Sequence, residues 1–318
     1  MLLEEREYYK PFVYPWAFEF YKRQQQMHWL PDEVPLQDDI KDYKEKLSPD
    51  NRLLLDNIFK FFTQADVDVC CGYAKHYLPT FKQPEIRMML VSYASMEAVH
   101  QEAYSLLLET LGKSDDMYQE FFDIQAMSEK HEYLTDFSMK NPHEIAKTMA
   151  VYSGFTEGVQ LFSSFAILLN YPRHNLMKGM GQIVTWSIRD ETLHVEGMSQ
   201  LFRTFIQENP ELWNDDLKYE IYCAAERTVE LEDAFIDLCF EGAEVPDLTA
   251  TEVKEYIRYI ADRRLLGLGM KKIFGSESNP LPWLDYMLNG VEHTNFFENR
   301  ATEYARASTT GNWQDIFK

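Results

Sequence analysis

Two short motifs in this chain have the residue types and the spacing to bind metal ions. Glu97 and His100 form one Glu-x-x-His pair, and Glu191 and His194 form a second. Of the eight histidines in the sequence, only these two follow a glutamate by three residues. Because residues three apart lie on one face of a helix, each motif can direct a carboxylate and an imidazole to the same place. One such motif is commonly a surface ion pair, but two on separate predicted helices favour a shared site.

The residues around both motifs favour burial. Apolar side chains share a helical face with each motif in two stripes: Leu90, Tyr93, Glu97, His100, Tyr104 and Leu107 in the first, and Val184, Ile188, Glu191, Val195, Met198 and Leu201 in the second. Both motifs are therefore predicted to face the protein interior. A buried carboxylate is costly unless it is paired, hydrogen-bonded or bound to a metal, so we expect a cation to join the two motifs.

Two lone carboxylates complete the predicted ligand set. In helical bundles that hold two iron or manganese ions, two Glu-x-x-His motifs act with one further carboxylate from each of two other helices. Glu157 is the only charged residue between positions 148 and 170, and Asp66 lies on an apolar helical face, whereas Asp68 lies on a more polar one. Such oxygen and nitrogen donors suit iron or manganese better than a metal that prefers thiolates. The predicted metal ligands are Asp66, Glu97, His100, Glu157, Glu191 and His194.

The elements that must position these ligands are predicted to be helices. Apolar residues recur at steps of three and four along almost the whole chain, so the predicted fold class is an all-α bundle. Ser48-Pro49 and the capping box from Thr249 to Glu252 predict helix starts, and Gly112 predicts a helix end. We expect one domain over residues 1–304, with an N-terminal arm to about residue 45, and a tail over residues 305–318. The predicted core helices cover residues 50–78, 85–111, 143–170, 175–207, 215–241 and 250–270.

Composition argues against several classes of protein. The chain has 318 residues, 45% of them apolar, and a formal charge of −21, which disfavours binding to nucleic acid or to an anionic membrane. Residues 148–170 could be mistaken for a membrane span, but Glu157 near the middle favours a helix buried in protein. The N-terminus lacks a signal-peptide pattern, and the four cysteines form no C-x-x-C pair. A cytoplasmic protein with reduced thiols is therefore predicted.

Five separated segments together resemble one known family. They are residues 95–104 (SMEAVHQEAY), 156–158 (TEG), 189–194 (RDETLH), 28–34 (HWLPDEV) and 295–304 (NFFENRATEY). On these segments, and over essentially its whole length, the chain resembles the small, radical-generating (beta) subunit of class I ribonucleotide reductase. The spacings of 31 residues from Asp66 to Glu97 and of 34 residues from Glu157 to Glu191 also match that family.

The resemblance implies a fold and a mechanism. It implies a ferritin-like bundle in which two metal ions, Fe/Fe or Mn/Mn, activate O₂, and an O₂-derived oxidant then generates a stable radical on Tyr104. Tyr104 follows His100 by one helical turn, on the metal-facing stripe. Trp29, Asp190 and His100 would connect the cluster to the surface, and Tyr304 would pass the radical to the large subunit. That subunit would reduce ribonucleoside diphosphates to deoxyribonucleotides. Without the resemblance, ordinary packing and surface pairing would be the simpler explanation for Trp29, Asp190 and Tyr304.

The resemblance also implies partners. The large (alpha) subunit would bind the tail, where Trp313, Ile316 and Phe317 would be unfavourable if exposed. A homodimer is expected, an activating flavoprotein is compatible with the site, and neither nucleic acid nor a membrane is expected as a partner. Leu161 and Ser187 depart from the bulky apolar residues common around the family's radical pocket, which bears on how well a radical is shielded and on the choice of metal.

Alternative functions use the same residues. A di-iron oxidase or oxygenase of the same bundle class would share all six ligands, but it would not explain Trp29 or the segment ending at Tyr304. A helical protein that stores metal or binds partners would not need Tyr104 one turn after His100. A bundle with surface ion pairs alone would require both motifs and Glu157 to coincide by accident.

Overall fold

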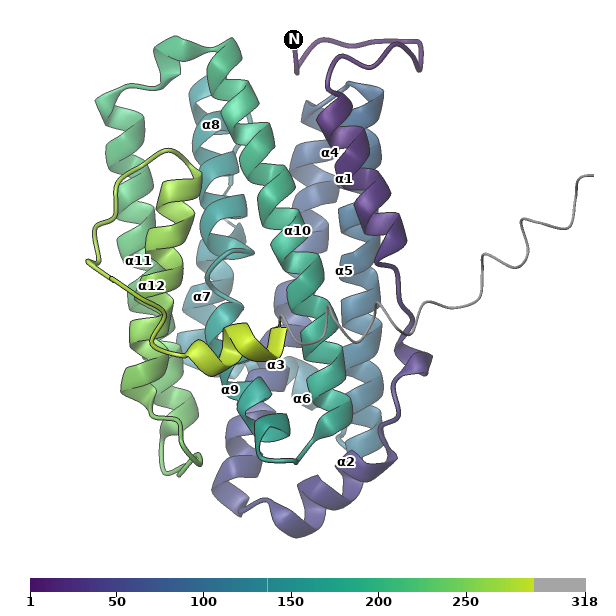
Figure 1. Cartoon of the computed structure of the whole chain (residues 1–318), viewed down its shortest axis with the longest axis vertical. Coiled ribbons are helices and arrows are strands. Elements are labelled where there is room, and N and C mark those ends of the chain that lie inside the picture. Colours follow the sequence, from purple (N-terminus) through teal and green to yellow (C-terminus); the bar gives the residue numbers. More distant parts are fainter. Residues whose placement is uncertain (136, 289–318) are drawn as a thin grey trace, which may run out of the picture. The chain divides into compact units, whose positions relative to one another are not determined.

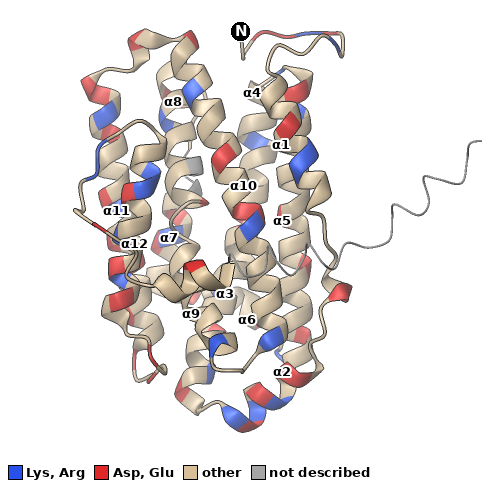
Figure 2. Ribbon diagram, in the orientation of Figure 1, with Lys and Arg blue, Asp and Glu red and all other residues tan. Residues whose placement is uncertain are grey.

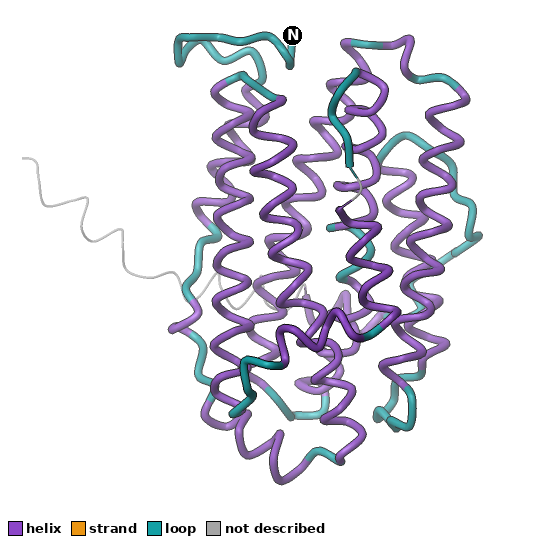
Figure 3. The backbone as a smooth tube through the Cα atoms, turned by 180° about the vertical axis from the view of Figure 1, so that it is seen from behind, coloured by secondary structure: helices purple, strands orange, loops and turns teal. Residues whose placement is uncertain are grey.

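A computed structural model of the chain describes residues 1–135 and 137–288. The chain divides into two compact units, Met1–Pro280 and Leu281–Lys318. In the second unit, residues 282–288 form a helical segment. Every described element of the first unit is a helix, and the backbone traced from behind shows no strand among the described residues (Figure 3).

The long helices of the first unit confirm the predicted fold class. They are α3 (Pro49–Gly72), α5 (Pro84–Leu111), α8 (Pro142–Val151), α9 (Phe162–Arg173), α10 (Lys178–Glu208), α11 (Asp215–Phe240) and α12 (Ala250–Gly267). The N-terminal arm is also helical, with α1 (Pro15–Gln26), η1 (Pro31–Glu33), α2 (Gln37–Lys41) and η2 (Asp42–Lys46). The remaining elements are η3 (Tyr73–Tyr77), α4 (Leu78–Thr80), α6 (Met117–Glu120), η4 (Phe121–Asp123), α7 (Gln125–Thr135), η5 (Tyr152–Thr156) and η6 (Pro210–Leu212).

Local sequence signals define several helix ends as predicted. The Ser48 hydroxyl accepts a hydrogen bond of 3.1 Å from the backbone N–H of Asn51 at the start of α3. Thr249 and Glu252 form the reciprocal capping box of α12. Gly112 ends α5 with φ of +79°, a left-handed conformation that glycine adopts without steric cost. These ends confirm the predicted boundaries.

The predicted helix over residues 143–170 is wrong in its middle. The chain leaves α8 through the π-helical segment η5, where the N–H of Glu157 donates to the carbonyl of Tyr152, and it passes through turns to the start of α9. A Cβ added at Gly158 would lie 2.3 Å from the carbonyl oxygen of Gly154. Because Gly158 has no Cβ, the backbone can pass this close to Gly154. Glu157 therefore lies on an irregular segment of backbone and not on a regular α-helix.

Helix α10 lies between two groups of helices in the first unit. Within residues 1–280, Figure 1 shows α10 between α1 and α5 on one side and α11 and α12 on the other. Packing contacts join α10 to α5, α8 and α9, while α3 packs on α5. Acidic and basic residues both occur along α1, α10 and α11, as Figure 2 shows. No helix in the described part of the chain is both long enough and apolar enough to cross a membrane.

Candidate metal centre

The structure brings the six predicted metal ligands together. Asp66 comes from α3, Glu157 follows η5, and the two Glu-x-x-His motifs lie on α5 and α10. Each of the six side chains is at most 1% exposed. Two groups have ligand atoms within 4.8 Å of one another: Asp66, Glu97 and His100 in the first, and Glu97, Glu157, Glu191 and His194 in the second.

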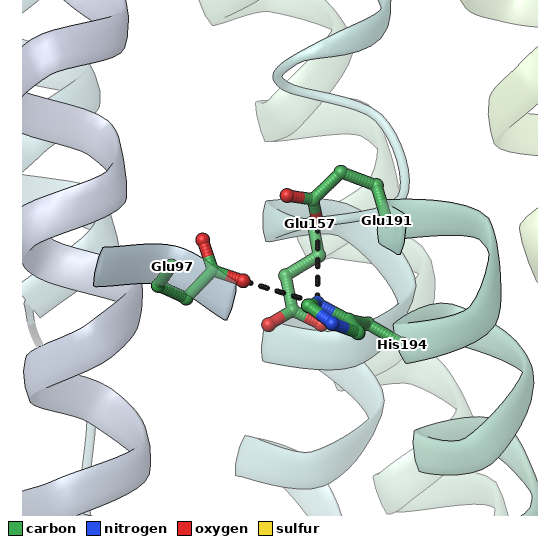
Figure 4. A group of neighbouring side chains, drawn as sticks. All are labelled: Glu97, Glu157, Glu191 and His194. Atoms are coloured by element: carbon green, nitrogen blue, oxygen red, sulfur yellow. Dashed lines mark ion pairs between the residues drawn. The ribbon is translucent and has the colours of Figure 1, made fainter. Parts of the chain in front are cut away.

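Two carboxylates face both histidines. The Oε1 of Glu97 lies 3.0 Å from Nδ1 of His194, and its Oε2 lies 3.5 Å from Nδ1 of His100. Glu191 repeats this arrangement, with Oε1 3.3 Å from Nδ1 of His100 and Oε2 3.7 Å from Nδ1 of His194. Figure 4 shows Glu97 reaching from α5 toward Glu157, Glu191 and His194. Each of these two carboxylates therefore has one oxygen for each half of the site.

Several buried polar atoms of the cluster have ligand capacity that hydrogen bonds do not use. Within the described residues, no hydrogen bond of normal geometry reaches seven buried atoms: Oδ2 of Asp66, both carboxylate oxygens of Glu97 and of Glu157, Oε2 of Glu191 and Nδ1 of His194. Each buried polar atom left unpaired costs about 1–3 kcal/mol. Metal ions would satisfy them, and four carboxylates with two imidazoles are suitable donors for iron or manganese. The residues present therefore fit a dinuclear metal centre.

Burial and mutual repulsion shift the pKa values of these groups. Burial raises the pKa of Asp66 and of Glu157 well above the usual range, and the neighbouring carboxylates raise both further. Burial alone would lower the pKa of His194, but its contacts with Glu191 and Glu97 raise it to about 10. Without metal, protons would therefore take the place of cations, and metal binding would displace them.

A chain of contacts leads from the cluster to Trp29. The indole Nε1 of Trp29 donates a hydrogen bond of 2.8 Å to Oδ2 of Asp190, which lies 3.2 Å from Nε2 of His100. The rings of Trp29 and His100 are stacked, with centroids 6.0 Å apart. Trp29 is 3% exposed and Asp190 is fully buried. The structure thus brings together three of the residues predicted for radical transfer, whereas Tyr304 lies outside the described residues.

Tyr104 lies in an aromatic pocket. It is 1% exposed, and its ring stacks on Phe62 at 4.7 Å between centroids, with Phe165 beyond Phe62 at 5.1 Å. Its hydroxyl donates to Oγ of Ser187 across 3.5 Å. Burial, followed by the charge of Asp66, raises the pKa of the phenol far above its ordinary value, so the phenol stays protonated.

Sequence reasoning missed two residues beside the cluster. Gln24 on α1 hydrogen-bonds both Asp190 and His194, and Arg264 on α12 holds the carbonyl of Gly158. In the run Gln24-Gln25-Gln26 only Gln24 is buried. The one available signal was its position two helical turns after the buried Ala17.

An all-α bundle with a buried cluster of carboxylates and imidazoles defines the ferritin-like class of metal-binding helical proteins. Comparison with known proteins narrows this class. The profile of the family described as "Ribonucleotide reductase, small chain" matches residues 6–280. The chain therefore belongs to the ribonucleotide reductase small chain family. The predicted family, its oxidoreductase class and the ferritin-like fold are confirmed.

Relatives match over almost the full length of the chain. A probable ribonucleoside-diphosphate reductase small subunit, 376L, of Invertebrate iridescent virus 6 is 46% identical, covering 99% of this chain and 98% of its own. The ribonucleoside-diphosphate reductase subunit beta of Chlamydia pneumoniae is 33% identical, covering 93% and 89%. The solved structure of the ribonucleotide reductase R2 subunit from Clostridium botulinum shares the fold, with a TM-score of 0.81, 21% identity and coverage of 86% and 88%.

Proposed function

We propose that this chain is the radical-generating subunit of a ribonucleoside-diphosphate reductase. In this proposal a dinuclear metal centre activates O₂, Tyr104 stores one oxidising equivalent, and the large subunit uses it to reduce ribonucleotides. One observation carries the metal part of the proposal: Glu97 and Glu191 each direct separate oxygens to both His100 and His194. Family membership supports the reaction, and the burial of Tyr104 supports the site of storage.

The ligands divide between two ions. Asp66, Glu97 and His100 would hold one ion, and Glu157, Glu191 and His194 would hold the other, with Glu97 within reach of both. When bound, the metal pair supplies the capacity to reduce O₂ and to oxidise a nearby phenol. Hard oxygen and imidazole nitrogen donors suit both iron and manganese, so the donor types alone do not distinguish Fe/Fe from Mn/Mn. A structure of a dimanganese(II) NrdF protein from Streptococcus sanguinis has the same fold, with a TM-score of 0.74 and 22% identity.

The pocket of Tyr104 protects a radical in two ways. Phe62 covers one face of the ring, and the surrounding core excludes water that could quench the radical. The Ser187 hydroxyl oxygen accepts the hydrogen bond of the Tyr104 hydroxyl across 3.5 Å and so orients the phenol. Although Ser187 is more polar than the side chain expected in this pocket, it is itself only 1% exposed. A serine at position 187 therefore adds a hydrogen-bond acceptor without opening the pocket to solvent.

Radical transfer completes the proposal. His100, Asp190 and Trp29 form the inner part of the route through the contacts described above. Tyr304 and the tail over residues 305–318 would form its outer part and the docking segment for the large subunit. Deleting residues 311–318 should abolish turnover in the mixed complex while the metal content stays the same.

One solved structure supports the proposed assembly. The structure named as the Rnr4 homodimer of Saccharomyces cerevisiae has the same fold, with a TM-score of 0.72 and 18% identity, which supports a homodimer here. An activating flavoprotein and a cytoplasmic location stay predictions.

Loading the protein anaerobically with Fe(II) or Mn(II), and then admitting air, tests the radical. We expect a tyrosyl electron paramagnetic resonance signal in the wild type and none in Tyr104→Phe, with equal metal uptake. Tyr171→Phe is the matched control, because Tyr171 is a buried tyrosine on α9 that hydrogen-bonds Asn51 and takes no part in the proposal. No signal with either metal would overturn the assignment of Tyr104.

A further inference from the structure

The side chain of Gln24 hydrogen-bonds His194 and the residue that supports His100. It comes from α1, which carries none of the proposed ligands, and it is 1% exposed. Its Nε2 donates a hydrogen bond of 3.1 Å to Oδ1 of Asp190, and its Oε1 lies 3.1 Å from Nε2 of His194. One amide thus connects the residue that supports His100 with His194 itself.

Chemistry sets the direction of these hydrogen bonds. An ionised carboxylate only accepts, so the amide nitrogen of Gln24 must face Asp190 and the amide oxygen must face His194. An amide oxygen also only accepts, so Nε2 of His194 must carry the hydrogen. The remaining nitrogen of His194, Nδ1, is the atom that faces Glu97 at 3.0 Å and Glu191 at 3.7 Å.

His100 is oriented in the same way by the other end of this network. Its Nε2 lies 3.2 Å from Oδ2 of Asp190, while the Oδ1 of that carboxylate accepts from Gln24. The Nδ1 of His100 is therefore free to face Glu97 at 3.5 Å and Glu191 at 3.3 Å. Both imidazoles present the same nitrogen to the cluster because one amide and one carboxylate hold the other nitrogen of each.

We propose that Gln24 is a positioning residue for the metal centre, one that keeps Nδ1 of His194 directed at the metal and, through Asp190, supports His100. This inference rests on the proposed metal function. Histidines that bind metals almost always donate their other N–H to a carboxylate or carbonyl, and loss of that partner typically weakens metal binding by about 10–100-fold. For His194 the described structure offers Gln24 as this partner.

The two histidines should respond differently to loss of the amide. Gln24→Met removes both hydrogen bonds at similar volume, so His194 loses its partner while His100 keeps Asp190. The ion held by Glu157, Glu191 and His194 should then bind about 10–100-fold more weakly, and the other ion should change less. Gln24→Glu keeps an acceptor for His194 but places a second carboxylate against Asp190. That variant should recover binding at His194 and weaken the half that contains His100.

Co(II) is a suitable probe because it does not require O₂ and shifts the proton signals of histidines bound to it. Anaerobic titration followed by visible absorption gives the two affinities. Proton magnetic resonance of the loaded protein gives one shifted, exchangeable Nε2–H signal for each bound histidine. In Gln24→Met we expect weaker binding of one ion and faster solvent exchange of one of the two signals, and in Gln24→Glu a restored signal for His194.

Gln83→Met is the matched control. Gln83 is also a buried glutamine, at 4% exposed, and its amide donates to the carbonyls of Met1 and Glu4 rather than to the cluster. It should leave both affinities and both signals unchanged. If wild-type protein fails to bind two Co(II) ions, the proposed metal function falls and this inference with it. If wild type binds two ions and both Gln24 variants match it in affinities and signals, the role of Gln24 alone is overturned.

Discussion

The guanidinium Nε of Arg264 donates a hydrogen bond of 2.8 Å to the carbonyl oxygen of Gly158. This bond ties α12 to the residue that directly follows Glu157. The guanidinium also lies over the ring of Phe162 at 4.9 Å. Burial lowers the pKa of Arg264 to about 10, so it still carries its charge at neutral pH. The break between α8 and α9 is thus supported from a helix that contributes no predicted ligand.

Gly158→Ala should destabilise the protein through this break. The added Cβ would lie 2.3 Å from the carbonyl oxygen of Gly154 and 2.9 Å from Nε of Arg264, so backbone must shift. Overpacking of this kind costs about 1–3 kcal/mol in the free energy of unfolding. Urea unfolding of the metal-free protein measures it. Gly267→Ala is the control, because a Cβ there meets nothing within 4 Å. Equal stability of the two variants would contradict the prediction.

Lys130→Met should be strongly destabilising. Lys130 and Glu232 form an ion pair in which both side chains are fully buried, and Lys130 also lies over Phe61 at 3.6 Å. Removing the ammonium leaves a buried carboxylate without its cation, which costs about 3–5 kcal/mol. The double variant Lys130→Met/Glu232→Leu should recover part of this loss in the same unfolding measurement. The exposed pair of Arg227 and Glu230 offers a comparison, since Arg227→Met should cost less than about 1 kcal/mol.

Asp42 should contribute to stability only above acidic pH. Burial alone would raise its pKa, but the Lys46 ammonium at 2.6 Å and the N–H of Met177 at 2.9 Å hold the pKa below the ordinary value of 3.8. A carboxyl group with a lowered pKa in the folded state stabilises above its unfolded pKa, and the contribution is lost as the pH falls through its folded pKa.

The stability difference between wild type and Asp42→Asn tests this. It should be present at pH 7 and shrink as the pH falls below about 4, as measured by urea unfolding at each pH. Asp38→Asn, at an exposed position on the preceding helix α2, should show little effect at either pH. A difference that stays constant down to pH 3 would assign the role of Asp42 to shape rather than to charge.

Trp29→Phe should separate radical formation from radical use. The substitution keeps an aromatic ring against His100 but removes the indole N–H that donates to Asp190. We expect unchanged metal content and a retained tyrosyl signal, together with loss of most nucleotide reduction in the presence of the large subunit. Trp213→Phe, at a partly buried tryptophan that packs on Phe202, should retain turnover. Full activity in Trp29→Phe would remove Trp29 from the proposed route.

Sequence periodicity predicted the long helices well because each has apolar spacing of its own, and α3, α8, α11 and α12 also begin at a local side-chain cap. The start of α10 was less predictable. Its N-cap, Met177, uses no side chain, and the first N–H groups donate instead to Asp39 and Asp42. These acceptors lie 135–141 residues earlier in the chain. The residues next to the start of α10 in the sequence give no sign of such a cap. This explains why the start of α10 was predicted three residues early.

In the site, too, the features set by local sequence were predicted and those set by tertiary packing were missed. Spacing and apolar neighbours were sufficient to select Asp66 over Asp68, and in the structure Asp66 is buried in the cluster while Asp68 pairs with His131. The break around Glu157 was missed because Gly154 and Gly158 are separated in the sequence, and a single glycine is tolerated within a helical pattern. Gln24 was missed because its importance arises from how α1 packs on α5 and α10, which no local pattern expresses.

The placement of α1 has a practical consequence for fragments of this protein. A chain shortened to begin at Pro49 would keep every proposed ligand, and its remaining long helices would still have their apolar faces. It would lack the amide that orients His194 and the indole that supports Asp190. Such a fragment could be helical, well expressed and complete by its motifs, and yet bind metal weakly. A search by motif alone would score it as intact.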